Sequence, residues 1–147
     1  MSTGGKIDAP KLTDLSLANV FVVGDSIQFP QVSNIDASSF RVSNSGSLIL
    51  PSVVSYTADN SGLNGGSLFE ANGVNSTLSL PHLTKLEGTT GWAKSFAVSA
   101  TNGGQISFPK LAQIEAGSIN FTADGGTAAL PSHIALNVLT SFHSTLG

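Results

Sequence analysis

The stretch Thr77-Leu-Ser-Leu-Pro-His-Leu-Thr-Lys-Leu86 carries a pattern that recurs along the whole chain. Apolar residues stand three and one positions before a proline, and two and five positions after it. Of the 24 apolar positions in six such frames, 23 hold an apolar residue if tyrosine and alanine are counted, and only His133 departs. An internal repeat of this period predicts a stacked repeat architecture. The prolines of the six frames are Pro10, Pro30, Pro51, Pro81, Pro109 and Pro131.

Alternation of apolar and polar residues before each proline is typical of a β-strand with one buried face. Proline has no N–H to donate and fixes its own φ, so within sheets it belongs at strand ends and corners. A proline at the same place in every unit therefore predicts a repeated corner, with equivalent residues stacked about 4.8 Å apart. The expected outward neighbours in this strand are Asp8, Gln28, Ile49, Ser79, Ser107 and Ala129.

Successive prolines are 20, 21, 30, 28 and 22 residues apart, which indicates a base coil of about 21 residues. The two longest intervals contain insertions at residues 57–66 and 87–94, and insertions in such repeats form loops, often on one face. We therefore expect one domain over residues 1–147, folded as an all-β, parallel β-solenoid of about six coils, two of them with loop insertions.

A second strand is expected before the proline strand, at residues 39–43, 95–99 and 118–122, with Gly/Asn turns between the two strands. The equivalent stretch at residues 67–71 allows either Leu68 and Glu70 or Phe69 and Ala71 to face inward. The second option avoids burying a carboxylate, so we expect that one. The inward residues expected elsewhere in this strand are Phe40, Val42, Phe96, Val98, Ile119 and Phe121.

The composition restricts both partners and chemistry. Six Lys and Arg stand against nine Asp and Glu without a basic patch, which disfavours nucleic acid and anionic membranes as partners. The chain has no cysteine, which excludes disulfides, Cys-ligated metals and thiol catalysis. No apolar run approaches the ~18 residues that a membrane span needs.

Both ends of the chain match the middle of a coil. Residues 4–10 match residues 103–109, and residues 141–147 resemble residues 39–45. Open coils expose unpaired strand edges, so we expect a piece excised from a longer repeat protein, with end-to-end self-association. Alternatively, residues 134–146 form a capping helix, because their apolar residues also fall on one helical face.

The frame, an apolar-x-apolar-Pro-x-Leu-x-x-Ile string followed by Gly-Ser or Ala-Ser, resembles the leucine-rich-type β-solenoid repeats of very large bacterial secreted or surface proteins. It is also similar, more loosely, to bacterial cell-surface leucine-rich repeats, although the ladder asparagine of those repeats is absent. The resemblance covers nearly the whole chain and implies an extracellular or cell-surface location. It implies a non-enzymatic structural or adhesive segment and provides no functional residues to transfer.

Seven residues in or beside the two insertions are candidates for ligand binding. An aromatic ring on a loop can stack on a sugar or anchor an interface, or it can fold back over the side of the coil. The insertions follow equivalent points of successive coils, so they should emerge close together and form a shallow site, or remain two solvated Gly-rich loops. Polar groups with one aromatic ring suit carbohydrate, which makes a carbohydrate-binding module the alternative function. The candidates are Tyr56, Asp59, Asn60, Asn64, Glu87, Trp92 and Lys94.

Tyr56 differs from the other candidates because it occupies an apolar position of the frame. We expect its ring to be buried with its hydroxyl at the edge.

Catalysis is not expected. The three histidines are far apart in the repeat, and no HExxH, calcium-loop or phosphate-loop motif is present. The expected outward row before the prolines contains one carboxylate and no base, whereas polysaccharide-cleaving β-helices need clustered acids. We therefore expect no enzyme activity, no metal and no cofactor.

Overall fold

A computed structural model of the chain describes residues 7–60, 66–90, 95–115, 117–125, 132–136 and 141–142. These ranges are all-β, which confirms the expected class. The strands that form in them are β1 (Asn19–Val23), β2 (Ser26–Gln28), β3 (Ser39–Ser43), β4 (Ser47–Ile49), β5 (Ser55–Thr57), β6 (Ser67–Asn72), β7 (Thr77–Ser79), β8 (Lys85–Glu87), β9 (Phe96–Thr101), β10 (Gln105–Phe108), β11 (Gln113–Glu115), β12 (Ile119–Asp124), β13 (His133–Leu136) and β14 (Ser141–Phe142).

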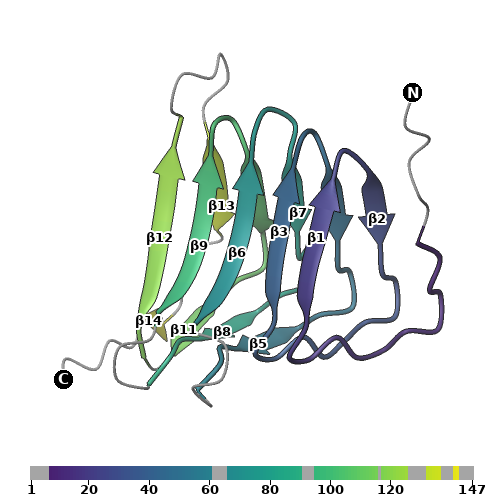
Figure 1. Cartoon of the computed structure of the whole chain (residues 1–147). Coiled ribbons are helices and arrows are strands. Elements are labelled where there is room, and N and C mark those ends of the chain that lie inside the picture. Colours follow the sequence, from purple (N-terminus) through teal and green to yellow (C-terminus); the bar gives the residue numbers. More distant parts are fainter. Residues whose placement is uncertain are drawn as a thin grey trace.

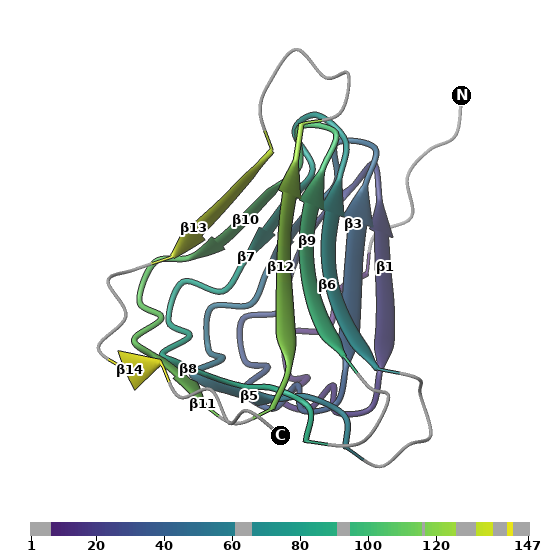
Figure 2. The same ribbon diagram turned by 90° about the vertical axis from the view of Figure 1, so that its left-hand side faces the viewer.

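The strands form three parallel sheets (Figures 1 and 2). The first sheet has the order β1-β3-β6-β9-β12, the second β13-β10-β7-β4-β2 and the third β14-β11-β8-β5. Strands that follow one another in the chain lie in different sheets, so the chain passes from the first sheet to the second, then to the third and back. We call one such passage a circuit, for example β3, β4 and β5. In the second view, the three sheets enclose a triangular cross-section (Figure 2).

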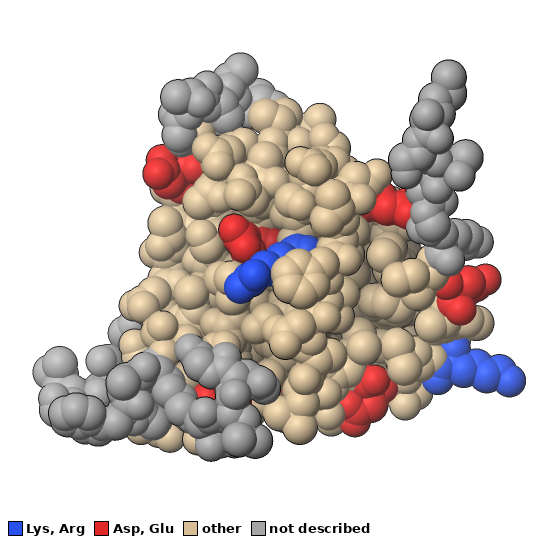
Figure 3. Space-filling model, viewed as in Figure 1, with Lys and Arg blue, Asp and Glu red and all other residues tan. Residues whose placement is uncertain are grey.

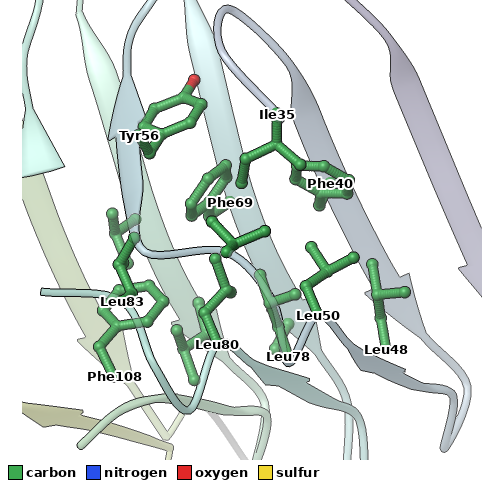
Figure 4. Close-up of a cluster of buried hydrophobic side chains, with 14 of the residues drawn as sticks. Ile35, Phe40, Leu48, Leu50, Tyr56, Phe69, Leu78, Leu80, Leu83 and Phe108 are labelled. Carbon is green, nitrogen blue, oxygen red and sulfur yellow. The ribbon is translucent and has the colours of Figure 1, made fainter. Parts of the chain in front are cut away.

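The core consists of apolar columns that run across the circuits. In the second sheet, Leu48 pairs with Leu78, and Leu78 pairs with Ile106. Consecutive strand residues point to opposite faces, so one face of every strand contributes to these columns. Leu48 and Leu78 are fully buried, and Figure 4 shows the aliphatic and aromatic side chains gathered between the sheets.

The strands of the first sheet face as the sequence predicted, at a different register. Phe69 and Ala71 are buried in β6 while Glu70 is only half-buried, which confirms the option that keeps the carboxylate out of the core. Phe40 is opposite Phe69, and Phe69 is opposite Val98. The strands β9 and β12 therefore extend further than the matching strings indicated, and the stacking partner of Phe40 is two residues later than Phe96.

The third sheet is a feature that the sequence reasoning missed. The chain was expected only to bend after each proline, yet β5, β8, β11 and β14 pair there as three- or two-residue strands. Their inward residue is the apolar residue five positions after the proline, such as Tyr56 or Leu86. Each proline frame therefore spans one corner and two strands.

The proline corners are joined from one circuit to the next by side-chain hydrogen bonds. The Ser52 hydroxyl donates to the Pro30 carbonyl at 2.6 Å, and His82 Nδ1 donates to the Pro51 carbonyl at 2.7 Å. The residue after each proline can thus bond to the preceding circuit, while the proline itself, which lacks an N–H, terminates the strand.

The sixth frame was placed wrongly by the sequence reasoning. The segment that stacks on β10 is β13, with Ile134 opposite Ile106, and Phe142 is opposite Ile114 in the third sheet. Both residues lie six positions later than the frame around Pro131 predicted, so the stacking segment contains no proline. His133 takes an outward, exposed position, and Ala135 rather than Ala129 follows Ser107 in the outward row.

The physical reason for this shift is burial. The shifted register places isoleucine where the predicted one placed Ala128, and a larger apolar side chain removes more surface from water. The same shift takes His133 out of the apolar position that it alone appeared to violate. Ala128, Leu130 and Pro131 lie outside the described residues.

The capping-helix alternative for residues 134–146 is wrong over the part that the structure describes, because His133–Leu136 and Ser141–Phe142 are strands. Among all described residues, none belongs to a helix with the length and hydropathy needed to cross a membrane.

Candidate functional site

The two insertions start from the same corner of successive circuits, where the chain leaves the third sheet and returns to the first. The first lies between β5 and β6, the second between β8 and β9. Their bases are joined, because Asn60 Oδ1 accepts a hydrogen bond from the Thr90 N–H at 2.7 Å and one from the Thr90 hydroxyl at 3.3 Å. The Asn60 amide donates to the Ala58 carbonyl at 3.3 Å. The structure therefore brings the bases of the insertions together.

The second insertion is also tied to the following circuit. Thr89 forms an antiparallel bridge with Ser118, and the Ser118 N–H donates to the Thr89 carbonyl at 2.8 Å. Gly117, just before Ser118, has φ +71°, and a Cβ there would lie 2.1 Å from the Thr89 carbonyl oxygen. Only glycine allows this close approach of the two backbones.

Three of the seven candidates, Asn64, Trp92 and Lys94, lie outside the described residues. The site argued from them stays a prediction. The other four, Tyr56, Asp59, Asn60 and Glu87, are described and have different surroundings.

Tyr56 is a core residue of the third sheet. It is fully buried, and its ring centroid lies 4.6 Å from that of Phe69 and 4.9 Å from that of Phe96 (Figure 4). Its hydroxyl donates to the Ser38 carbonyl at 2.9 Å. Burial raises the pKa of Tyr56, and the Asp36 and Asp59 carboxylates add to this, whereas a hydrogen bond with the Ser67 hydroxyl opposes it. The phenol is thus held neutral and hydrogen-bonded inside the molecule.

Asp59 is also buried, with 1% of its surface exposed. Its N–H donates to the hydroxyl of Ser67, which is buried as well, at 3.0 Å. This contact joins the start of the first insertion to the start of β6. Asp59 therefore lies inside the corner of the fold, below the molecular surface.

Glu87 lies on the outward face of the third sheet, in a small ionic group. Lys85 Nζ is 2.7 Å from a Glu115 oxygen and 3.8 Å from a Glu87 oxygen. The hydrogen bond from Glu115 raises the pKa of Lys85, and both carboxylates favour its charged form. These side chains are more than one third exposed, so the group is well solvated and stabilises the fold little.

The described base of the site is therefore a scaffold whose polar groups bond to one another. Asn60, Asp59 and Tyr56 each hold a neighbouring segment in place. Direct contacts with a ligand would fall to the outer parts of the insertions.

Sequence reasoning missed two buried serines that join circuits. Ser38 Oγ accepts the Ala18 N–H at 2.9 Å and donates to the Leu15 carbonyl. Ser76 Oγ donates to the Asn72 carbonyl at 2.8 Å and accepts the Ser45 N–H at 3.2 Å. A serine one residue before an expected strand was the available signal, but serine is too frequent in this chain for the signal to stand out.

Comparisons with protein-family models, with curated proteins and with solved structures give no match for this chain.

Proposed function

We propose that the chain is a parallel β-solenoid segment of a large secreted or cell-surface protein, with a non-enzymatic structural or adhesive role. The resemblance of its repeat to leucine-rich-type solenoid repeats supports the location and the role. A coil of about 21 residues, enlarged by the insertions, accounts for the spacing of the columns. About six such coils would fill the chain.

The observation that carries the proposal is the fixed register between circuits. Strands pair in parallel with the equivalent strands of neighbouring circuits, as in the columns Leu48–Leu78–Ile106 and Tyr56–Leu86–Ile114. Such a fold can be lengthened by adding circuits, without any new kind of contact. It suits a rigid spacer that holds other parts of a protein away from a surface.

Polar contacts on the outside support the same role. The Thr77 hydroxyl donates to the Ser47 hydroxyl at 2.9 Å, and the Asn102 amide donates to Asn72 Oδ1 at 3.0 Å. Short hydroxyl and amide side chains therefore link the circuits where longer charged side chains would be free to move. Each bond is worth about 1 kcal/mol, and together they stiffen the outer faces.

Location decides between this proposal and an intracellular role. Antibodies raised against the chain should label intact cells that produce the parent protein, without permeabilisation. Excess soluble chain should reduce attachment of those cells to their usual surface if the role is adhesive, and leave attachment unchanged if it is purely structural. Labelling that requires permeabilisation would contradict the proposal.

Carbohydrate binding is the second candidate, favoured by the hydrogen bonds that join the bases of the two insertions through Asn60 and Thr90. On a panel of neutral and acidic polysaccharides, Trp92→Ala should abolish binding. The matched control is Phe21→Ala, which removes an exposed aromatic ring from the first sheet and should bind like the wild type. A wild-type chain without affinity for any member of the panel would leave the structural role alone.

A further inference from the structure

The first strand of the first sheet has an open edge. Within the described residues, β1 pairs with β3 on one side only. Its sequence, Asn-Val-Phe-Val-Val, contains no charge and no proline, the usual features that protect edge strands. Phe21 and Val23 point outward from this strand and are 60% and 59% exposed. The strand therefore has the properties of a site for strand pairing.

The first sheet has a direction that determines which strand fits this edge. In a parallel pair, alternate residues of a strand bond to the neighbour on one side. The carbonyl of Ala18 accepts from the Ser39 N–H at 2.9 Å, and the Gly24 N–H donates to the Ser43 carbonyl at 3.0 Å. The residues of β1 that bond to β3 are thus those in phase with Ala18 and Gly24, whose side chains in the strand face inward. The outward-facing Asn19, Phe21 and Val23 direct their N–H and C=O groups to the open edge.

The last strand of the same sheet shows the opposite arrangement. The Asp124 carbonyl accepts from the Asn102 N–H at 3.0 Å, so the outward-facing residues of β12 bond to β9. The inward-facing residues, Ile119, Phe121 and Ala123, direct their backbone groups away from β9. Inward-facing residues also form the bonds from each inner strand to the next. The open edge of β12 thus matches the open edge of β1 as β1 matches β3.

The apolar columns are also incomplete at the last circuit. Phe121 and Leu136 point to the interior but are 37% and 39% exposed. Equivalent inward residues of inner strands, Val98 and Phe108, are fully buried because another circuit covers them. A further circuit stacked on β12 and β13 would cover Phe121 and Leu136 in the same way.

Few charges oppose such stacking. The outward face of the first sheet is mostly uncharged (Figure 3). Arg41, next to β1, is occupied: its guanidinium lies 5.4 Å from the Phe21 ring centroid and 3.7 Å from a Glu70 oxygen. The edge strand and its neighbour therefore carry no unbalanced charge that would repel a second strand.

We propose that the occupant of this edge is a second copy of the chain, which places its β12 and β13 against β1 and β2 in a parallel, head-to-tail assembly. Val20 of one copy would then follow Phe121 of the other in the same column, and Ile27 would follow Ile134. The contact repeats the one between successive circuits inside the chain. It depends on the stacking geometry alone, so it stands or falls independently of where the parent protein resides.

Two proline variants test the direction of the assembly. Phe21→Pro and Ala123→Pro each remove an N–H that points to an open edge, so the internal ladder stays intact. In sedimentation velocity, the wild type should grow in mass with concentration, whereas each variant alone should stay monomeric, with association weakened by about tenfold or more. An equimolar mixture of the two variants has one open edge of each kind and should form a one-to-one dimer that grows no further.

A charged pair provides the matched control and a second route if a proline variant does not fold. Phe21→Lys with Val23→Lys places two charges on the edge strand and should block association. Ser99→Lys with Thr101→Lys places the same charges in the same two columns of the inner strand β9 and should leave association unchanged. A wild-type chain that stays monomeric at its highest soluble concentration overturns the proposal. So does association that survives Ala123→Pro, because that result indicates head-to-head pairing, and so does equal loss in the β9 control.

Discussion

At the scale of single residues, the circuits are held together by buried hydroxyls as well as by apolar columns. Tyr56, Ser38 and Ser76 each bond to a backbone carbonyl of another segment. A buried polar group without a partner costs about 1–3 kcal/mol, so the groups that accept these bonds depend on them. The aromatic ring of Tyr56 contacts the buried rings of two strands of the first sheet at the same time.

Removal of the Tyr56 hydroxyl should therefore destabilise the chain without emptying the core. We expect Tyr56→Phe to lower the free energy of unfolding by about 1 kcal/mol, because the Ser38 carbonyl loses its donor. Chemical denaturation followed by circular dichroism measures the change. An unchanged midpoint would show that the hydroxyl makes no net contribution.

The same residue makes stability depend on alkaline pH. Burial raises the pKa of folded Tyr56 above the value of 10.0 that applies to the unfolded chain, so the folded state holds the proton more tightly. Its contribution should be fully present below pH 10 and should fall as the pH rises further. Lys85 has a raised pKa and acts in the same sense, so the difference between wild type and Tyr56→Phe isolates the phenol. Tyr56 is the only tyrosine, and tyrosinate absorbance should rise only on unfolding.

Gly104 is required for the close packing of two corners. A Cβ at this position would lie 2.0 Å from the Ala71 carbonyl oxygen, which is backbone and cannot rotate away. We expect Gly104→Ala to cost about 1–3 kcal/mol of unfolding free energy. Gly24→Ala is the control, since its Cβ would meet only the Asn44 carbonyl oxygen at 3.5 Å and would bear only the strain of φ +67°. An equal loss in both variants would contradict the steric argument.

At the scale of elements, the strands are too short to be stable alone. Those of the second and third sheets contain two to four residues, and a single pair of such strands is marginal in water. Each strand depends on the strands on either side of it and on the other two sheets. The positions that face inward should therefore dominate the stability of each strand.

Neighbouring residues of β4 test this difference. Leu48 is fully buried, whereas Ile49 faces outward and is half-buried. Leu48→Ala should cost about 2–5 kcal/mol through lost burial and a cavity, and Ile49→Ala should cost less than about 1 kcal/mol. Denaturant titration of the two variants provides the comparison. Similar losses would mean that the outward face is covered by something.

At the scale of the whole molecule, contacts run mainly between neighbouring circuits. Stability in such an arrangement is close to a sum of unit and interface contributions, so parts of it can unfold separately. When the chain is pulled from its two ends, we expect stepwise unfolding, each step releasing one circuit, or roughly 7–10 nm of chain. A single step of about 50 nm would show instead that the whole chain is one cooperative unit.

The repeat was visible in the sequence because burial imposes the same residue type on equivalent positions. The all-β class, the parallel stacking, the inward residues Phe40, Leu48 and Leu78, and the choice of Phe69 over Leu68 all follow from apolar spacing and the cost of a buried carboxylate. For the candidate site, the common corner of the two insertions followed from the same alignment. The roles of Tyr56 and Asp59 inside that corner did not, because a residue type does not show where its polar atoms will find partners.

The amino-acid sequence by itself determined which side chains must be buried and roughly how often the chain must turn. Only the tertiary structure decided that there are three sheets, that β13 stacks six residues later than the Pro131 frame implied, and that the open edges of β1 and β12 have complementary backbone directions. The physical reason is that apolar spacing is a local property, whereas register and edge direction depend on which backbone groups meet across circuits. A string such as Ala-Leu-Pro can match the repeat, yet the register that buries the larger side chains prevails.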